Sequence, residues 1–168
     1  MKVTITLVFT ILIFCGCHTK QESPNTLPVD AEQSLRSAKE LVLYSLDPCC
    51  IEDGNESEIP QLYGYQILGQ TELNNESDLN QIVDDYLRGV SEHDEMGVAA
   101  CFDPRHAIRV EHDAETHDFL ICFYCSKTKW YIDGNFREII NHTDHAKSGL
   151  NQLLKEADIE LAKLPGEK

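Results

Sequence analysis

The chain has 168 residues, of which 14 are Lys or Arg and 29 are Asp or Glu, so its formal net charge is −15. Affinity for a phosphate backbone comes largely from Lys and Arg, and this balance therefore argues against DNA, RNA and electrostatic attachment to anionic lipid surfaces. The hydrophobic share of 42% is that of a folded protein rather than a disordered or fibrous one. The length suits one domain, for which about 150 residues is usual.

Residues 1–16 predict a secretion signal. Lys2 precedes an apolar run over 3–14, which is shorter than the about 20 apolar residues that a membrane-spanning helix needs and fits the apolar region of a signal peptide. Gly16 followed by Cys17 resembles the cleavage site of bacterial lipoproteins, where a small residue precedes the lipidated cysteine. We expect Cys17 to carry the lipid, and the alternative is ordinary secretion with cleavage nearby.

The predicted lipid implies a protein of the bacterial cell envelope, held at a membrane and facing the periplasm or the exterior. Residues 17–29 after the leader are mostly polar and contain two prolines, as expected of a flexible tether. Residues 30–168 are then a single folded domain.

The first half of the domain predicts two helices and two strands. Helical spacing of apolar residues indicates a helix over 30–38 with Asp30 as its cap, and a clearer helix over 77–90 with Ser77 as its cap. The strands are a short run, apolar on both faces, over 41–46, which is typical of a central strand, and a longer one over 62–73. The acidic residues 49–61 between the two strands predict a surface loop.

The second half predicts four strands and a last helix over 144–157. The strands are 98–102, 106–112, 117–124 and 128–132. Short connections with turn-forming residues predict that these strands pair in order as an antiparallel meander. Alternation places Phe119, Ile121 and Phe123 on the face that the helices cover. The predicted class is therefore α+β, with an antiparallel sheet of five or six strands and helices packed on one face.

Two stretches of this half resemble a known family. The segments 100–109 (ACFDPRHAIR) and 118–125 (DFLICFYC) resemble a family of uncharacterised bacterial envelope proteins that are often labelled lipoproteins. The similarity covers about residues 98–132 and is weaker over 43–48, with Ala107 and Tyr124 where that family often has Gly and Glu. The resemblance implies an envelope location and supplies no activity.

Six cysteines follow the leader. If Cys17 is lipidated, five remain, so at least one thiol is unpaired or joined to another chain. Cys122 and Cys125 form a Cys-x-x-Cys motif, but a strand follows it rather than the helix N-terminus of a redox-active pair. These six are Cys17, Cys49, Cys50, Cys101, Cys122 and Cys125.

A zinc site is a second interpretation of the cysteines, with Cys101, His106, Cys122 and Cys125 as ligands. A four-residue loop at 113–116 and a three-residue loop at 103–105 would place Ala107 between Cys101 and Cys122. That register separates the two cysteines by roughly 9 to 10 Å, which is too far for a disulfide and awkward for shared ligation. Buried free thiols are therefore favoured for Cys101 and Cys122 over zinc ligands.

The histidines and arginines of the domain do not predict a catalytic or metal site. All seven histidines lie in polar stretches, so we expect solvated surface histidines. Arg105 and Arg109 either form a local anion site or pair with Asp103 and Glu111, and we favour pairing.

The sequence contains no Ser-His-Asp order, phosphate-binding glycine loop or HExxH helix. It therefore predicts a non-enzymatic binding or structural module without a cofactor, whose partner is a small molecule or another envelope protein. The alternatives are an envelope zinc protein and, more distantly, a thiol oxidoreductase.

Overall fold

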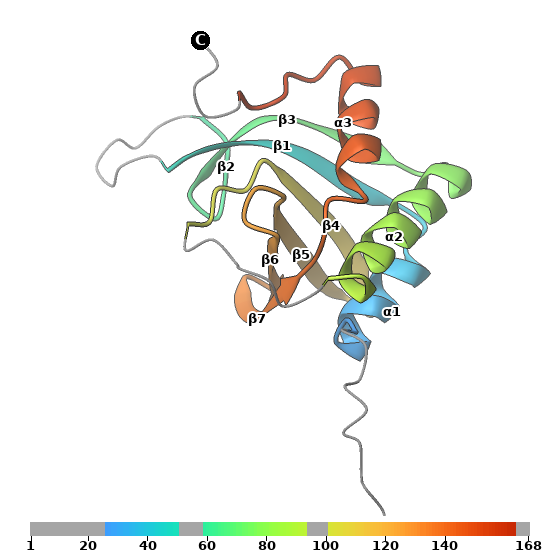
Figure 1. Cartoon of the computed structure of the whole chain (residues 1–168). Helices are drawn as coiled ribbons and strands as arrows, with labels where there is room; N and C mark the ends of the chain where they lie inside the picture. Colours follow the sequence, from blue (N-terminus) through green and yellow to red (C-terminus); the bar gives the residue numbers. More distant parts are fainter. Residues whose placement is uncertain (1–25, 51–58, 94–100, 164–168) are drawn as a thin grey trace, which may run out of the picture.

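The computed structural model describes residues 26–50, 59–93 and 101–163. These residues form three α-helices and one antiparallel sheet of seven strands in the order β2-β3-β1-β4-β5-β6-β7 (Figure 1). No helix among them is long and apolar enough to cross a membrane. The elements are α1 (Val29–Ser37), β1 (Leu41–Cys50), β2 (Gln61–Leu62), β3 (Tyr65–Leu73), α2 (Glu76–Ser91), β4 (His106–His112), β5 (Glu115–Cys122), β6 (Lys127–Ile132), β7 (Asn135–Asn141) and α3 (Lys147–Glu156).

The predicted α+β class is confirmed, and so is the antiparallel pairing in order of the last three predicted strands, which are β4, β5 and β6. An unpredicted strand, β7, continues the meander beyond β6. The sheet has seven strands rather than five or six. β7 was not predicted and two strands, β2 and β3, replace the single strand predicted over 62–73, whereas the strand predicted over 98–102 is not part of the sheet. Tyr63 and Gly64 separate β2 from β3 with φ angles of 52° and 83°, as in a two-residue hairpin turn. The leader and Cys17 lie outside the described residues.

The sequence predicts that residues 98–102 pair with β4. In the structure β1 occupies that edge of β4, and Tyr44 lies opposite Ala107. Residues 98–100 are not described, and Cys101 and Phe102 lie outside any strand. The predicted meander across Pro104 is therefore wrong at this point.

The predicted register between β4 and β5 is wrong by two residues. The turn consists of Asp113 and Ala114 alone, with φ angles of 51° and 66°, so Ala107 pairs with Leu120 and not with Cys122. Both residues adopt the left-handed conformation that a tight hairpin turn of this kind requires. A two-residue turn instead of a four-residue loop is the physical reason for the shift.

The helices lie where the apolar periodicity predicts them, but their caps differ. The side chain of Asn75, not Ser77, caps α2 by accepting hydrogen bonds from the backbone nitrogens of Ser77 at 2.9 Å and Asp78 at 3.4 Å. Asp30 lies in the first turn of α1 instead of capping it, where its negative charge favours the helix N-terminus.

All three helices pack on one face of the sheet (Figure 1). Phe119 and Ile121 of β5 are fully buried on this face, as predicted, and Phe123 packs partly buried against the same core. This core is the larger of the two and holds the helices against the sheet.

The opposite face of the sheet carries a second, smaller core of six buried residues. The sheet curls around this core. The curl is evident from the ring of Tyr63, next to β2, which stacks on Tyr131 of β6 with the ring centroids 4.0 Å apart. The buried members are Tyr44, Leu46, Leu62, Tyr65, Ala107 and Leu120.

Candidate functional site

Helix α3 carries a row of polar side chains at steps of four residues, formed by Lys147, Asn151 and Lys155. Residues four apart lie above one another on a helix, so the three share one side. Leu150 and Leu154 on the neighbouring side are buried and fix α3 against the sheet. The row is thereby held at the start of β4.

The row on α3 forms one wall of a pocket of about 340 Å³. Arg105 and His106, at the start of β4, form a second wall, and the chain after α3 forms the third. The lining residues are Arg105, His106, Lys147, Asn151, Lys155, Leu161, Ala162 and Lys163. We call this cavity the basic pocket.

The chain after α3 is held across the sheet by three contacts. Ser45 donates from Oγ to the carbonyl oxygen of Glu160 at 2.6 Å, and Ile159 lies over Gly69 so closely that a Cβ there would be 2.7 Å from it. Arg105 donates from Nε to the carbonyl oxygen of Lys163 at 3.3 Å. Figure 1 shows this segment crossing the end of the molecule that carries α3.

Four cationic side chains line the basic pocket, and no Asp or Glu does. Within the described part of the chain, none of the four forms an ion pair with a carboxylate. A local excess of positive charge in a chain of net charge −15 produces a focused positive potential. The four are Arg105, Lys147, Lys155 and Lys163.

His106 lies at the back of the basic pocket and is only 4% exposed. Its Nε2 is 2.8 Å from Oδ1 of Asn151, and its ring meets the edge of Phe123 with centroids 5.4 Å apart. Burial lowers the pKa of His106 to about 4; the fields of Lys147 and Arg105 lower it further, against the opposing effect of the Asn151 hydrogen bond. The ring is therefore neutral at pH 7.

The prediction of solvated histidines is wrong for His106 and also for His117 and His142, which are 1% and 0% exposed. The ring of His117 stacks on Trp130 at 5.8 Å, and that of His142 lies between Tyr86 and Phe123. Burial lowers the pKa of both rings. The polar residues next to these histidines in the sequence suggested exposure. Strand alternation nevertheless places the side chains of His106 and His117 on a buried face of the sheet.

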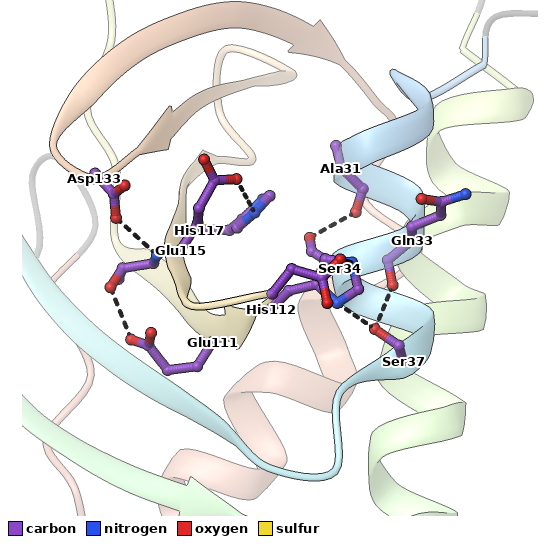
Figure 2. Close-up of polar contacts among 11 residues, drawn as sticks. Ala31, Gln33, Ser34, Ser37, Glu111, His112, Glu115, His117 and Asp133 are labelled. Atoms are coloured by element: carbon purple, nitrogen blue, oxygen red, sulfur yellow. Dashed lines mark hydrogen bonds and ion pairs between the residues drawn. The ribbon is translucent and has the colours of Figure 1, made fainter.

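The end of β4 away from the basic pocket contacts α1. His112 lies against Ser37 of α1, with Nδ1 2.8 Å from Oγ, and His117 lies beside Glu115 with Nε2 3.9 Å from the carboxylate (Figure 2). Ser37 Oγ also donates to the carbonyl oxygen of Gln33 at 2.7 Å. The contact between Ser37 and His112 joins α1 to the β4–β5 hairpin.

Arg105 and Arg109 do not share a site. Arg109 points to the opposite face of the sheet, where its guanidinium donates to both carboxylate oxygens of Asp118 at 2.7 and 2.9 Å. Asp118 also accepts a hydrogen bond from the hydroxyl of Tyr63 at 2.8 Å. Pairing is thus confirmed for Arg109, but its partner is Asp118 and not Asp103 or Glu111, while Arg105 lines the basic pocket.

The structure does not bring the four predicted zinc ligands together as a metal site. Cys122 and Cys125 form a disulfide across the β5–β6 loop, Cys101 is an exposed free thiol, and Nε2 of His106 faces Asn151. In the described residues no group of three or more His, Cys, Asp or Glu could hold a metal ion. Zinc binding by this set stays a prediction, and it would require the disulfide to open.

The expectation of buried free thiols is wrong for both cysteines, because Cys122 is bonded to Cys125 and Cys101 is exposed. As predicted, a strand follows the Cys-x-x-Cys motif, since β6 begins at Lys127. Both half-cystines are buried, which limits access of a disulfide substrate. The side chains of Cys49 and Cys50 are not described.

Sequence reasoning missed Lys147, Asn151, Lys155 and Lys163. The first three had a signal, because their spacing of four places them on one side of the predicted last helix. Nothing in the sequence joins that side to Arg105, which is more than forty residues away in the chain.

Comparisons with known proteins add no relative: no protein-family model, curated protein or solved structure matches the chain. The family resemblance over residues 98–132 therefore stays a prediction from the sequence.

Proposed function

We propose that the chain is a lipid-anchored protein of the bacterial cell envelope whose domain binds a small anion in the basic pocket without chemical conversion. The observation that carries the proposal is the set of four cationic side chains around one cavity from which carboxylates are absent in the lining. Like charges brought together cost free energy unless a counter-charge joins them. An anionic ligand supplies that counter-charge.

The chemistry and size of the pocket support a small ligand. Arg105 offers a planar guanidinium, and Lys147 and Lys155 offer ammonium groups, all of which make charge-assisted hydrogen bonds to oxyanions. The pocket of about 340 Å³ lies at the lower end of the roughly 300 to 1,000 Å³ that ligand sites occupy. A small metabolite fits this space.

The position of the basic pocket supports a ligand from the surrounding compartment. His106, which lines the pocket, begins β4, and His112, which contacts α1, ends it. At the rise of a strand the two ends are roughly 20 Å apart, and Figure 1 places α1 and α3 toward opposite ends of the molecule. An anchor that precedes α1 is therefore attached at the end of the domain opposite the pocket, and a flexible tether leaves the pocket accessible from the surrounding compartment.

The anchor is tested by replacing Cys17 with Ser and fractionating cells. We expect the variant in the soluble fraction and the parent protein in membranes. Cys15→Ser is the matched control, since it changes the neighbouring cysteine and should leave the protein in the membrane fraction. Membrane retention of Cys17→Ser would show that this cysteine is not the anchor.

Ligand binding is tested by calorimetric titration of the soluble Cys17→Ser chain with inorganic phosphate at pH 7. We expect binding that is lost when Lys147→Gln and Lys155→Gln are introduced together. The control is Lys39→Gln with Arg137→Gln, which removes the same charge from exposed positions outside the pocket. If both double variants bind phosphate equally, net charge and not the basic pocket explains the binding.

A further inference from the structure

We propose that the basic pocket is built for a dianionic phosphate group, with Asn151 donating a neutral hydrogen bond to it and His106 positioning Asn151. This inference rests on the anion-binding function proposed above, and it names the ligand class and two further residues. His106 acts on the ligand through Asn151.

The orientation of the Asn151 amide leaves its N–H donors available to a ligand. Its Oδ1 lies 2.8 Å from Nε2 of His106, and an amide oxygen can only accept, so the imidazole donates and the Asn151 Nδ2 group is directed away from His106. Asn151 lines the basic pocket, and no hydrogen bond of its Nδ2 occurs among the described residues. The amide therefore offers free N–H donors beside Lys147 and Lys155.

The ring of His106 is held in place and fixes the orientation of the Asn151 amide. It is 4% exposed and packs against the edge of Phe123, so its position is set by the core and not by solvent. The groups that face it are the cationic Arg105 and Lys147 and the neutral Asn151. Because the ring is neutral, it carries a single proton, and the bond to Asn151 assigns that proton to Nε2.

The positive charge of the pocket lining favours a ligand group with two negative charges. The four cationic side chains are matched better by two negative charges on one group than by a single carboxylate. A phosphate monoester carries about 1.5 to 2 negative charges at pH 7 and offers three acceptor oxygens. Inorganic phosphate, whose second ionisation lies near neutrality, is a mixture of monoanion and dianion at this pH. Arg105, Lys147, Lys155 and Asn151 supply donors of three kinds for those oxygens, from two different elements.

Asn151 variants test the contact in the soluble Cys17→Ser chain. We expect Asn151→Ala to weaken the binding of inorganic phosphate about tenfold. Asn151→Asp should abolish it, although its carboxylate still accepts from His106 and so keeps that side of the core satisfied. Thermal unfolding of each variant reports whether the fold is intact. Glycerol 3-phosphate, titrated in parallel, distinguishes a phosphate monoester from free phosphate as the preferred ligand, and acetate should bind far more weakly than either.

His106 variants test the positioning role. His106→Leu removes the donor to Asn151 and should reduce the preference for phosphate over acetate, whereas His106→Gln keeps an N–H at similar reach and should restore it. In the chain with the native histidine, NMR should show the pKa of His106 rising when phosphate binds, because the anion offsets the field of Lys147 and Arg105.

Two results overturn parts of the scheme separately. Phosphate binding that depends on Lys147 and Lys155 but is unchanged in Asn151→Ala would refute the role of Asn151 and leave the anion-binding function standing. Absence of binding of phosphate, glycerol 3-phosphate and acetate to the parent chain would refute the proposed function itself.

Discussion

The ring of Tyr63 stacks on the ring of Tyr131 with centroids 4.0 Å apart and an interplanar angle of 24°. Tyr63 follows β2 and Tyr131 belongs to β6, and the strands β3, β1, β4 and β5 lie between them in the sheet. Only a strongly curled sheet brings these strands together. The curl encloses the ion pair of Arg109 with Asp118, to which the hydroxyl of Tyr63 also donates.

Removing Arg109 should destabilise this enclosed pair. Asp118 is 2% exposed, whereas its partner is 34% exposed, so Arg109→Met leaves a buried carboxylate with one remaining donor. We expect a loss of about 2 to 3 kcal/mol in the free energy of unfolding in urea. The double variant Arg109→Met with Asp118→Asn should recover part of the loss, because no buried charge remains. Strictly additive losses would show that the pair is not coupled.

Acidification should destabilise the fold through three buried histidines. Burial lowers the pKa of His106 to about 4 and also lowers the pKa of His117 and His142. Below the unfolded value of about 6.5, the unfolded chain binds protons that the folded chain does not, so stability falls as the pH drops. The share of His106 approaches about 3 kcal/mol near pH 4.

Urea unfolding at several pH values checks this dependence. The His106→Gln variant should lose less stability than the parent between pH 7 and pH 4.5, since one of the three titrations is removed. Parallel curves for the two proteins would contradict the assignment to His106.

Loss of the Cys122–Cys125 disulfide should lower stability moderately. The bond closes only a four-residue loop, for which the loop-entropy relation gives about 2 kcal/mol. Thermal unfolding of Cys122→Ala with Cys125→Ala measures the loss. Cys101→Ser changes an exposed thiol and should stay within about 0.5 kcal/mol of the parent. An equal loss in both would place the effect outside the disulfide.

Adding a methyl group at Gly69 should disturb the wall of the basic pocket. A Cβ at this position would lie 2.7 Å from Cγ2 of Ile159, so we expect Gly69→Ala to cost about 1 to 2 kcal/mol. Ile159→Ala makes room and should reduce the cost of the second substitution in a double-mutant cycle.

Gly134→Ala is the matched control for Gly69→Ala. Its cost comes from the positive φ of 77°, with nothing within 4 Å of the added Cβ, so Ile159→Ala should not relieve it. Coupling of Ile159 to both glycines would show a general effect of the Ile159 substitution instead of a local contact.

Local patterns in the sequence were sufficient for the helices and for most of the sheet. The apolar spacing around Leu79 and Val90 predicted α2, and alternation at Phe119 and Ile121 predicted which face of β5 the helices cover. Such patterns repeat within a few residues, so they depend only on the element that contains them. β7 was not predicted, because its residues are mostly exposed and do not alternate between buried and exposed positions.

The tertiary structure alone decided the register, the cysteine pairing and the basic pocket. The left-handed conformations of Asp113 and Ala114 set a two-residue turn, and this choice moved every pair of β4 and β5 by two positions. Arg105 and Asn151 lie forty-six positions apart in the chain and line the same pocket because the core holds α3 at the start of β4. Residue types and local spacing determined which segments became helix or strand, whereas long-range packing determined which charges became neighbours.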